Sequence, residues 1–249
     1  LLAKTMGEEK YAFKCARGFW MVGSKHNLDM MAFLKSTGGW NDRIIDNCLA
    51  CLSDGETFFD IGANSGYVTT AVAAARPSSP VFAFEPLPDL SGNIAATAAK
   101  NDFKTVTVYE LALSNSTGHA DFYLPGHSIH ASFVSRSRNA RKIVVPTFRM
   151  DELIQSNAIP VPKVIKTDVE GAELQVFEGA LQTLKDYKPT VLFESDVNCE
   201  RFGYRPSDLV AILKGVGYSE IYFVDDASGE RLPIEQVTID SYGDYLATG

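Results

Sequence analysis

Long hydrophobic runs are absent from this 249-residue sequence. No stretch approaches the roughly 18 consecutive apolar residues that a membrane-spanning helix needs, so no membrane partner is expected. The opening residues, LLAKTMGEEK, lack a secretory pattern, and we expect a cytoplasmic protein. They do not begin with Met, which leaves a removed targeting segment open.

Positive charge is also scarce, because 23 Lys and Arg face 31 Asp and Glu for a formal net charge of -8. Binding of a polyanion depends on clustered Lys and Arg, so nucleic acid is not an expected partner. The basic run Arg136, Arg138, Arg141 and Lys142 is interpreted as solvated loop charge, with capture of an anionic substrate group as the alternative.

Cysteine is too rare for a disulfide scaffold, since the chain has only four. Cys48 and Cys51 have CxxC spacing, but Ile44, Cys48 and Leu52 recur at helical intervals. Core packing of a helix is therefore favoured over a metal or redox site, which would need a second ligand pair.

From residue 57 onward, short β-branched or aromatic runs alternate with longer helix-compatible stretches, as in a parallel sheet covered by helices. The expected strands are residues 57–61, 81–85, 105–110, 164–168, 190–194 and 220–224. The expected helices are residues 66–75, 90–100, 174–185 and 207–216. The sequence thus predicts an α/β, doubly wound, mostly parallel fold.

Two segments depart from this alternation. Residues 119–124 and 143–147 are expected to be strands of an inserted β-hairpin around a long polar loop, and such loops often shape binding sites. Residues 1–54 contain the apolar clusters FWMV and MMAFL, and we expect an N-terminal helical segment packed on the core. Residues 55–249 would then form the main domain.

The motif DIGANSG, residues 60–66, joins the first expected strand to the first expected helix. In open α/β sheets, ligands bind beyond the carboxyl ends of the strands, beside a helix N-terminus. Gly62 and Gly66 let the backbone turn tightly and approach a ligand. Residue 64 is Asn, so the GxGxxG spacing of dinucleotide sites is missing, which argues against a pyrophosphate ligand. An ordinary strand-to-helix turn is the alternative.

Glu85 ends the second expected strand, where an acid can accept hydrogen bonds from ribose hydroxyls. With the glycine turn it describes an adenosine-bearing ligand that keeps its 2'-hydroxyl. Asp60, the GANSG turn and Glu85 resemble the cofactor site of class I methyltransferases that use S-adenosylmethionine. An NAD-linked oxidoreductase also favours such an acid and is the first rival interpretation.

The segment VIKTDVEGAELQVFEGALQTL, residues 164–184, extends this likeness. Together with DIGANSGY, FEP, ELALSNSTG and PTFRMDEL, it resembles the FkbM family of methyltransferases over roughly residues 55–195. Two positions depart from the family pattern: Thr167 stands where an apolar residue is expected, and the segment LFESDVN lacks a His often found there. The second departure leaves the acceptor-side base open.

The resemblance implies a seven-stranded fold whose last strand is antiparallel, with S-adenosylmethionine as cofactor. It also implies O-methylation of a small hydroxylated or sugar-like acceptor. A non-catalytic adapter that keeps this fold is the second rival interpretation.

Methyl transfer depends on orientation of the reactants and on a group that draws the proton from the hydroxyl. Asp168 and Glu170 are candidate catalytic residues at the end of the fourth expected strand, and in extended backbone they would point the same way. They would act as base, as a carboxylate pair for the sulfonium or as ligands of a divalent cation, but two carboxylates are too few to define a metal site. Capping of the next helix by Glu170 and Glu173 is the alternative.

His127 and His130 lie in the expected hairpin loop and are further candidates for the base, because histidine titrates near neutrality. Solvated loop histidines are the alternative.

The residues expected at the cofactor lie at or directly after the carboxyl end of an expected strand. They are Asp60, Gly62, Ala63, Asn64, Gly66, Tyr67, Glu85, Pro86, Glu110, Leu111, Ala112 and Asp168. Asp60 would orient the loop or reach the cofactor amino group, with capping of the following turn as the alternative. Asn64 offers a donor and an acceptor to the cofactor tail, and Glu110 is expected at the adenine edge or simply at the surface.

Overall fold

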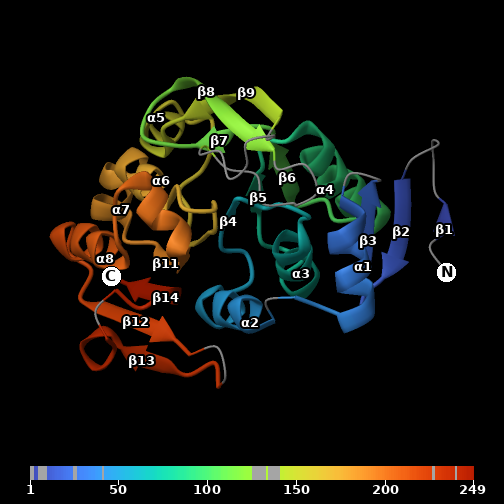
Figure 1. The fold of residues 1–249 in the computed structure, drawn as a ribbon. Coiled ribbons are helices and arrows are strands. Elements are labelled where there is room, and N and C mark those ends of the chain that lie inside the picture. The colour runs from blue at the N-terminus through green and yellow to red at the C-terminus, as the bar shows by residue number, and fades with distance from the viewer. Residues whose placement is uncertain are drawn as a thin grey trace. The chain divides into compact units, whose positions relative to one another are not determined.

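The computed structural model describes residues 3–4, 10–24, 27–40, 42–124, 133, 141–225, 228–238 and 240–249. The chain forms two compact units, Leu1–Glu110 and Leu111–Gly249. Each unit combines strands with helices, which confirms the α/β class (Figure 1). The predicted boundary after residue 54 falls inside the first unit and stays a prediction.

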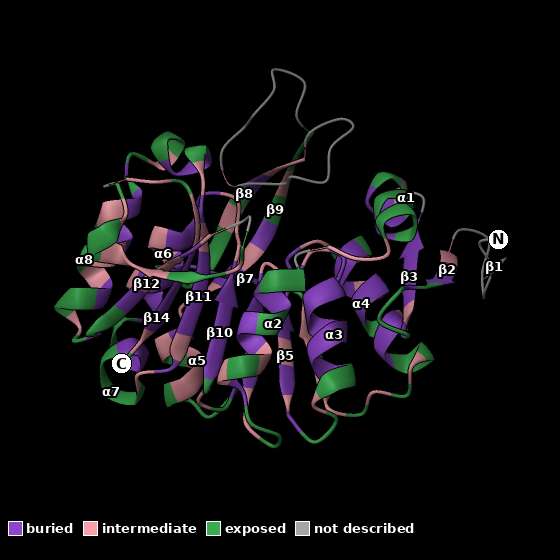
Figure 2. Cartoon of the chain, turned by 90° about the horizontal axis from the view of Figure 1, so that it is seen from below, coloured by how far each residue is buried: buried purple, intermediate pink, exposed green. Residues whose placement is uncertain are grey.

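The first unit contains parallel strands in the order β4-β5-β6. They are β4 (Phe58–Ile61), β5 (Val81–Phe84) and β6 (Val106–Tyr109). The connecting helices α3 (Tyr67–Ala75) and α4 (Pro88–Lys100) pack on β5 and β6 respectively. β4 is buried along its whole length, and Figure 2 shows α3 largely buried as well. These strands and helices lie where the sequence predicts them.

The N-terminal segment, residues 1–54, was expected to be helical but is only partly so. The prediction was wrong for FWMV, residues 19–22, most of which lies in a strand. The elements are β1 (Ala3–Lys4), β2 (Lys10–Lys14), β3 (Trp20–Ser24), α1 (Leu28–Thr37) and α2 (Asp42–Cys51). β2 and β3 pair antiparallel, and β3 lies against α1 and α4 (Figure 1).

Side chains of α4 and of the residue that follows it satisfy the outer edge of β3. Asn101 accepts a hydrogen bond from the Trp20 N–H at 2.7 Å and donates one to the Trp20 carbonyl at 2.8 Å. Thr97 Oγ1 accepts from the Val22 N–H at 2.9 Å. A strand edge needs such partners, and these lie about 80 residues away along the chain, so local apolar spacing could not predict the strand.

The CxxC pair lies on a helix, as expected. Cys48 is fully buried on α2 and contributes to the core, while Cys51 is partly buried at the helix end. Both cysteines are outside any disulfide. These positions agree with core packing.

The second unit contains strands in the order β13-β12-β14-β11-β10. They are β10 (Val164–Thr167), β11 (Thr190–Ser195), β12 (Glu220–Val224), β13 (Arg231–Pro233) and β14 (Gly243–Thr248). β10 and β11 are parallel, whereas β14 is antiparallel to both β11 and β12, as the family resemblance implied for the last strand. β13 pairs with β12 and is one strand more than expected.

The inserted hairpin is confirmed by β8 (Gly118–Leu124) and β9 (Arg141–Phe148), which pair antiparallel. The short strand β7 (Ala112–Leu113) runs parallel to β9. Most of the hairpin loop, including His127, His130, Arg136 and Arg138, lies outside the described residues. Lys142 forms an exposed ion pair with Asp121 at 2.7 Å, which agrees with solvated charge.

The other helical elements of this unit lie between and after these strands. They are α5 (Met150–Gln155), α6 (Glu173–Gly179), α7 (Leu181–Tyr187), α8 (Pro206–Gly215) and the 3-10 turns Val197–Phe202 and Ile234–Gln236. The prediction of a single helix over residues 174–185 was wrong, because the segment forms two helices that are separated at Ala180.

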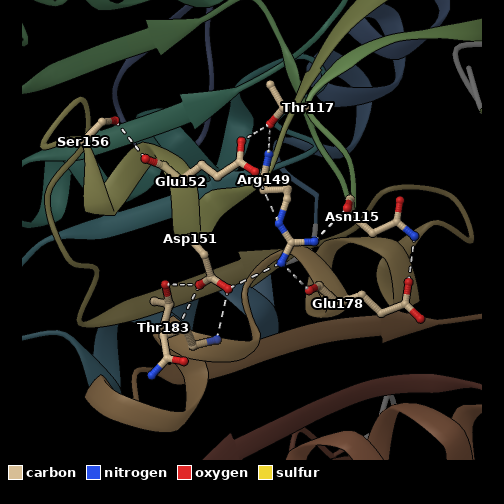
Figure 3. Close-up of polar contacts among 9 residues, drawn as sticks. Asn115, Thr117, Arg149, Asp151, Glu152, Ser156, Glu178 and Thr183 are labelled. Atoms are coloured by element: carbon tan, nitrogen blue, oxygen red, sulfur yellow. Dashed lines mark hydrogen bonds and ion pairs between the residues drawn. The ribbon is translucent and has the colours of Figure 1, made fainter.

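Side chains of the PTFRMDEL segment, residues 146–153, form hydrogen bonds to both helices at this break (Figure 3). Asp151 accepts hydrogen bonds from the N–H groups of Gln182 and Thr183, which are amides in the first turn of α7. Arg149 donates to the carbonyls of Asn115 at 2.7 Å and Glu178 at 3.3 Å, and the second of these lies at the end of α6. Arg149 thus caps the end of α6 and Asp151 caps the start of α7. These side-chain hydrogen bonds replace backbone hydrogen bonds that one continuous helix would make at this point.

Among the helices of the described residues, none combines the length and apolar character needed to cross a bilayer.

Candidate active site

Asp60 lies in β4 and supports the start of α3. Its side chain is fully buried, and its Oδ2 accepts hydrogen bonds from the Thr69 N–H at 3.0 Å and the Thr69 hydroxyl at 2.6 Å. Thr69 lies in the first turn of α3, where backbone N–H groups have no partner inside the helix. These contacts fit the capping alternative for Asp60 and fix the loop that follows it.

Residues 62–66, here called the ligand loop, turn sharply between β4 and α3. Gly62, Asn64 and Gly66 all have positive φ, at 74°, 50° and 77°. Asn is the non-glycine residue that tolerates this conformation best. A Cβ on Gly66 would lie 2.7 Å from Ile94 Cγ1, so glycine here allows close packing on α4.

Asn64 donates a hydrogen bond through its backbone and carries a buried acceptor in its side chain. Its backbone N–H donates to Glu85 Oε2 at 2.9 Å. Its side-chain Oδ1 is buried and has no hydrogen-bond partner among the described residues. A buried acceptor without a partner costs free energy, so this atom is available to a donor of a bound molecule. The ammonium group of S-adenosylmethionine is a donor of that kind, and the loop fits this cofactor.

Glu85 connects the ligand loop to the turn after β5. It is 5% exposed, and its second oxygen accepts from the Leu87 N–H at 2.9 Å. These two backbone N–H groups hold the carboxylate in place, and an ionised carboxylate is an acceptor for hydroxyl donors such as those of a ribose. The buried Pro86 lies between the two turns that Glu85 joins. The predicted role of Glu85 is compatible with these contacts and stays a prediction.

Two other expected cofactor residues have protein partners in the first unit. Glu110 is exposed and accepts a hydrogen bond from Ser91 Oγ at 2.9 Å. The Tyr67 ring is buried against Phe19, with ring centroids 5.5 Å apart. Burial, with a smaller contribution from Asp42, raises the pKa of the Tyr67 phenol to about 12, so it stays protonated.

In the second unit, the DVEG turn follows β10 and carries the candidate base. Asp168 is 18% exposed, and its Oδ2 lies 3.4 Å from the buried ammonium of Lys166. Glu170 and Gly171 have φ of 58° and 101°. The backbone is therefore a tight turn, and the expectation of extended backbone from Asp168 to Glu170 was wrong. Glu170 accepts a hydrogen bond from the Asn198 amide at 3.4 Å.

Glu173 holds the DVEG turn through its backbone amides. It is 2% exposed and accepts hydrogen bonds from Val169 N–H at 2.8 Å, Gly171 N–H at 3.4 Å and the Tyr204 hydroxyl at 2.8 Å. These amides belong to the turn before α6 (Glu173–Gly179), so Glu173 holds the turn, and α6 has no side-chain hydrogen bond at its N-cap. Burial raises the pKa of this carboxyl to about 7. Sequence reasoning missed Tyr204, which lies 31 residues away.

Glu194 is the second residue that sequence reasoning missed. It lies in β11 one residue beyond Phe193, which pairs with Thr167 of β10. Asp168 and burial together raise the pKa of Glu194 far above the usual carboxyl range. The signal was present in the sequence, because Glu194 and Asp168 both end neighbouring apolar strands.

Leu111 and Ala112 are buried at the start of the second unit, and Ala112 lies in β7. No group of three or more His, Cys, Asp or Glu residues in the described parts of the chain is arranged to hold a metal ion.

Comparison with known proteins gives the family. The methyltransferase FkbM domain matches residues 60–220, about two thirds of the chain. This chain belongs to the FkbM methyltransferase family. The match begins at Asp60 and includes the ligand loop, Glu85 and the DVEG turn, and family and fold imply the use of S-adenosylmethionine.

Individual proteins that resemble this chain share only a minority of its residues. The hexuronic acid methyltransferase AglP of Haloferax volcanii is 31% identical over 130 residues, which is 52% of each protein. The methyltransferase FkbM of Methylobacillus flagellatus has a TM-score of 0.51 and 18% identity, over 79% of this chain and 44% of that one. The second likeness supports the fold alone. The chain spans about half the length of these relatives.

Proposed function

We propose that this protein transfers the methyl group of S-adenosylmethionine to a hydroxyl of a small, sugar-like acceptor. The observation that carries the proposal is the buried Asn64 Oδ1 without a partner among the described residues, set in a loop whose backbone is fixed on Glu85. The family match and the relative that methylates a hexuronic acid support the choice of reaction and acceptor.

S-adenosylmethionine supplies an electrophilic methyl group on a sulfonium, and the protein residues provide positioning and proton transfer. Asp60 and Glu85 hold the ligand loop through the Thr69 and Asn64 backbone amides. With the cofactor bound, Asn64 Oδ1 would accept a hydrogen bond from its ammonium group, and Glu85 would accept from the ribose hydroxyls. Asp168 takes the proton as the acceptor O–H bond breaks, which makes the oxygen nucleophilic. The Lys166 ammonium lies 3.4 Å from Asp168 Oδ2 and forms an ion pair with it. No divalent cation is part of this proposal.

Binding and turnover separate this function from its rivals. Calorimetry should detect binding of S-adenosylhomocysteine and no binding of NAD, whereas the reverse result would identify an oxidoreductase. Release of S-adenosylhomocysteine is then measured with glucuronic and galacturonic acid glycosides as acceptors. Cofactor binding without turnover on any hydroxylated acceptor would identify the non-catalytic adapter. Turnover that survives dialysis against a chelator would agree with a mechanism free of metal.

A further inference from the structure

Asp168 and Glu194 form a carboxyl pair at the ends of two neighbouring strands. β10 and β11 run parallel with Thr167 opposite Phe193, and Asp168 and Glu194 are the residues that directly follow this last pair. The two carboxyls are close enough for Asp168 to be the largest cause of the raised pKa of Glu194. Two ionised carboxylates have only acceptors, so a hydrogen bond between them requires one proton.

The surrounding charges decide which carboxyl keeps this proton. Asp168 has the Lys166 ammonium 3.4 Å from its Oδ2. Glu194 lies opposite Asp244 of β14 and is also close to Asp196, so its neighbours Asp168, Asp196 and Asp244 are all acidic. A nearby cation favours the ionised form and nearby anions oppose it. The proton therefore belongs on Glu194 and the negative charge on Asp168.

We propose that Glu194 is protonated at neutral pH and donates a hydrogen bond to ionised Asp168, which makes Glu194 a positioning residue for the base. The bond fixes one oxygen of Asp168 and leaves the other oxygen for the acceptor hydroxyl. The shared proton follows from the strand register and from the charges around each carboxyl, whereas its catalytic purpose rests on the proposed function.

The shared proton has a consequence for stability that does not depend on catalysis. In the unfolded chain Glu194 titrates near the ordinary glutamate pKa of 4.5, while in the folded protein the pKa is raised by Asp168 and by burial. The contribution of this proton to the free energy of unfolding is then fully present below the unfolded pKa. It decreases as pH rises above that value, because the unfolded chain releases this proton first.

The first test compares the wild-type protein with Glu194→Gln, which resembles the protonated acid in shape and hydrogen bonding. Urea unfolding at about pH 5 and about pH 8 should show the variant gaining stability over the wild type at the higher pH. Glu220→Gln, at the exposed start of β12, is the control and should follow the wild type at both pH values. Parallel behaviour of wild type and Glu194→Gln would overturn the shared proton. Infrared spectroscopy adds a direct readout, since the band of a protonated carboxyl should weaken in this variant.

The second test concerns the base. Glu194→Gln keeps an N–H donor toward Asp168 and should keep kcat within about threefold, whereas Glu194→Leu should lower kcat on the order of tenfold or more, a part of what base catalysis contributes. The KM for S-adenosylmethionine should change little. Equal kcat values for the two variants would refute the positioning role. A stability difference in a protein that methylates no acceptor would refute the proposed function and leave the carboxyl pair in place.

Discussion

Glu85→Ala removes a single buried side chain on which two turns depend. The Asn64 and Leu87 N–H groups each donate to this carboxylate at 2.9 Å, and both would lose their acceptor. An orphaned buried donor costs about 1–3 kcal/mol, so we expect the loss of both bonds to lower the free energy of unfolding by about 2–6 kcal/mol. Loss of the ribose contacts should weaken cofactor binding by about 1–3 kcal/mol, or roughly 5- to 150-fold in Kd.

Two measurements separate these effects. Urea unfolding followed by circular dichroism gives the stability, and calorimetry with S-adenosylhomocysteine, performed where the variant is folded, gives the Kd. Glu56→Ala is the matched control, because Glu56 also holds a turn by accepting the Ser53 N–H at 2.7 Å but is not a candidate site residue. A folded Glu85→Ala protein that binds S-adenosylhomocysteine with wild-type affinity would refute the ribose assignment. Unchanged stability would refute the role in holding the ligand loop.

Three further predictions concern catalysis, pH and loop packing. Asp168→Asn should lower kcat by roughly 10²- to 10⁴-fold with little change in the Kd for S-adenosylhomocysteine, and a fully active variant would remove Asp168 from the reaction. Because burial raises the pKa of Glu173 from 4.5 to about 7, the wild type should lose about 3 kcal/mol of unfolding free energy as pH rises through this range, and urea unfolding of Glu173→Gln should show a shallower loss. Gly66→Ala should destabilise the protein by about 1–3 kcal/mol through backbone strain and its clash with Ile94, as thermal unfolding would show. Gly55→Ala shares the positive φ without a neighbour within 4 Å and should cost less; equal losses would show that the Ile94 contact is unimportant.

The sequence by itself determined the features that depend on neighbouring residues. The apolar runs of β4, β5, β10 and β11 identify buried strands without reference to any partner. The glycines of DIGANSG identify the turn between β4 and α3, because positive φ is a property of the residue and its immediate neighbours.

Tertiary structure decided the features in which a side chain satisfies a distant backbone group. β3 is a strand because Asn101 and Thr97 meet its edge, and α6 and α7 are separate because Arg149 and Asp151 cap them. Glu173 holds the DVEG turn together with Tyr204, and strand register brings Glu194 beside Asp168. The spacing of residues along the sequence does not predict these contacts, because a hydrogen bond or a raised pKa depends on distances that only the folded chain sets.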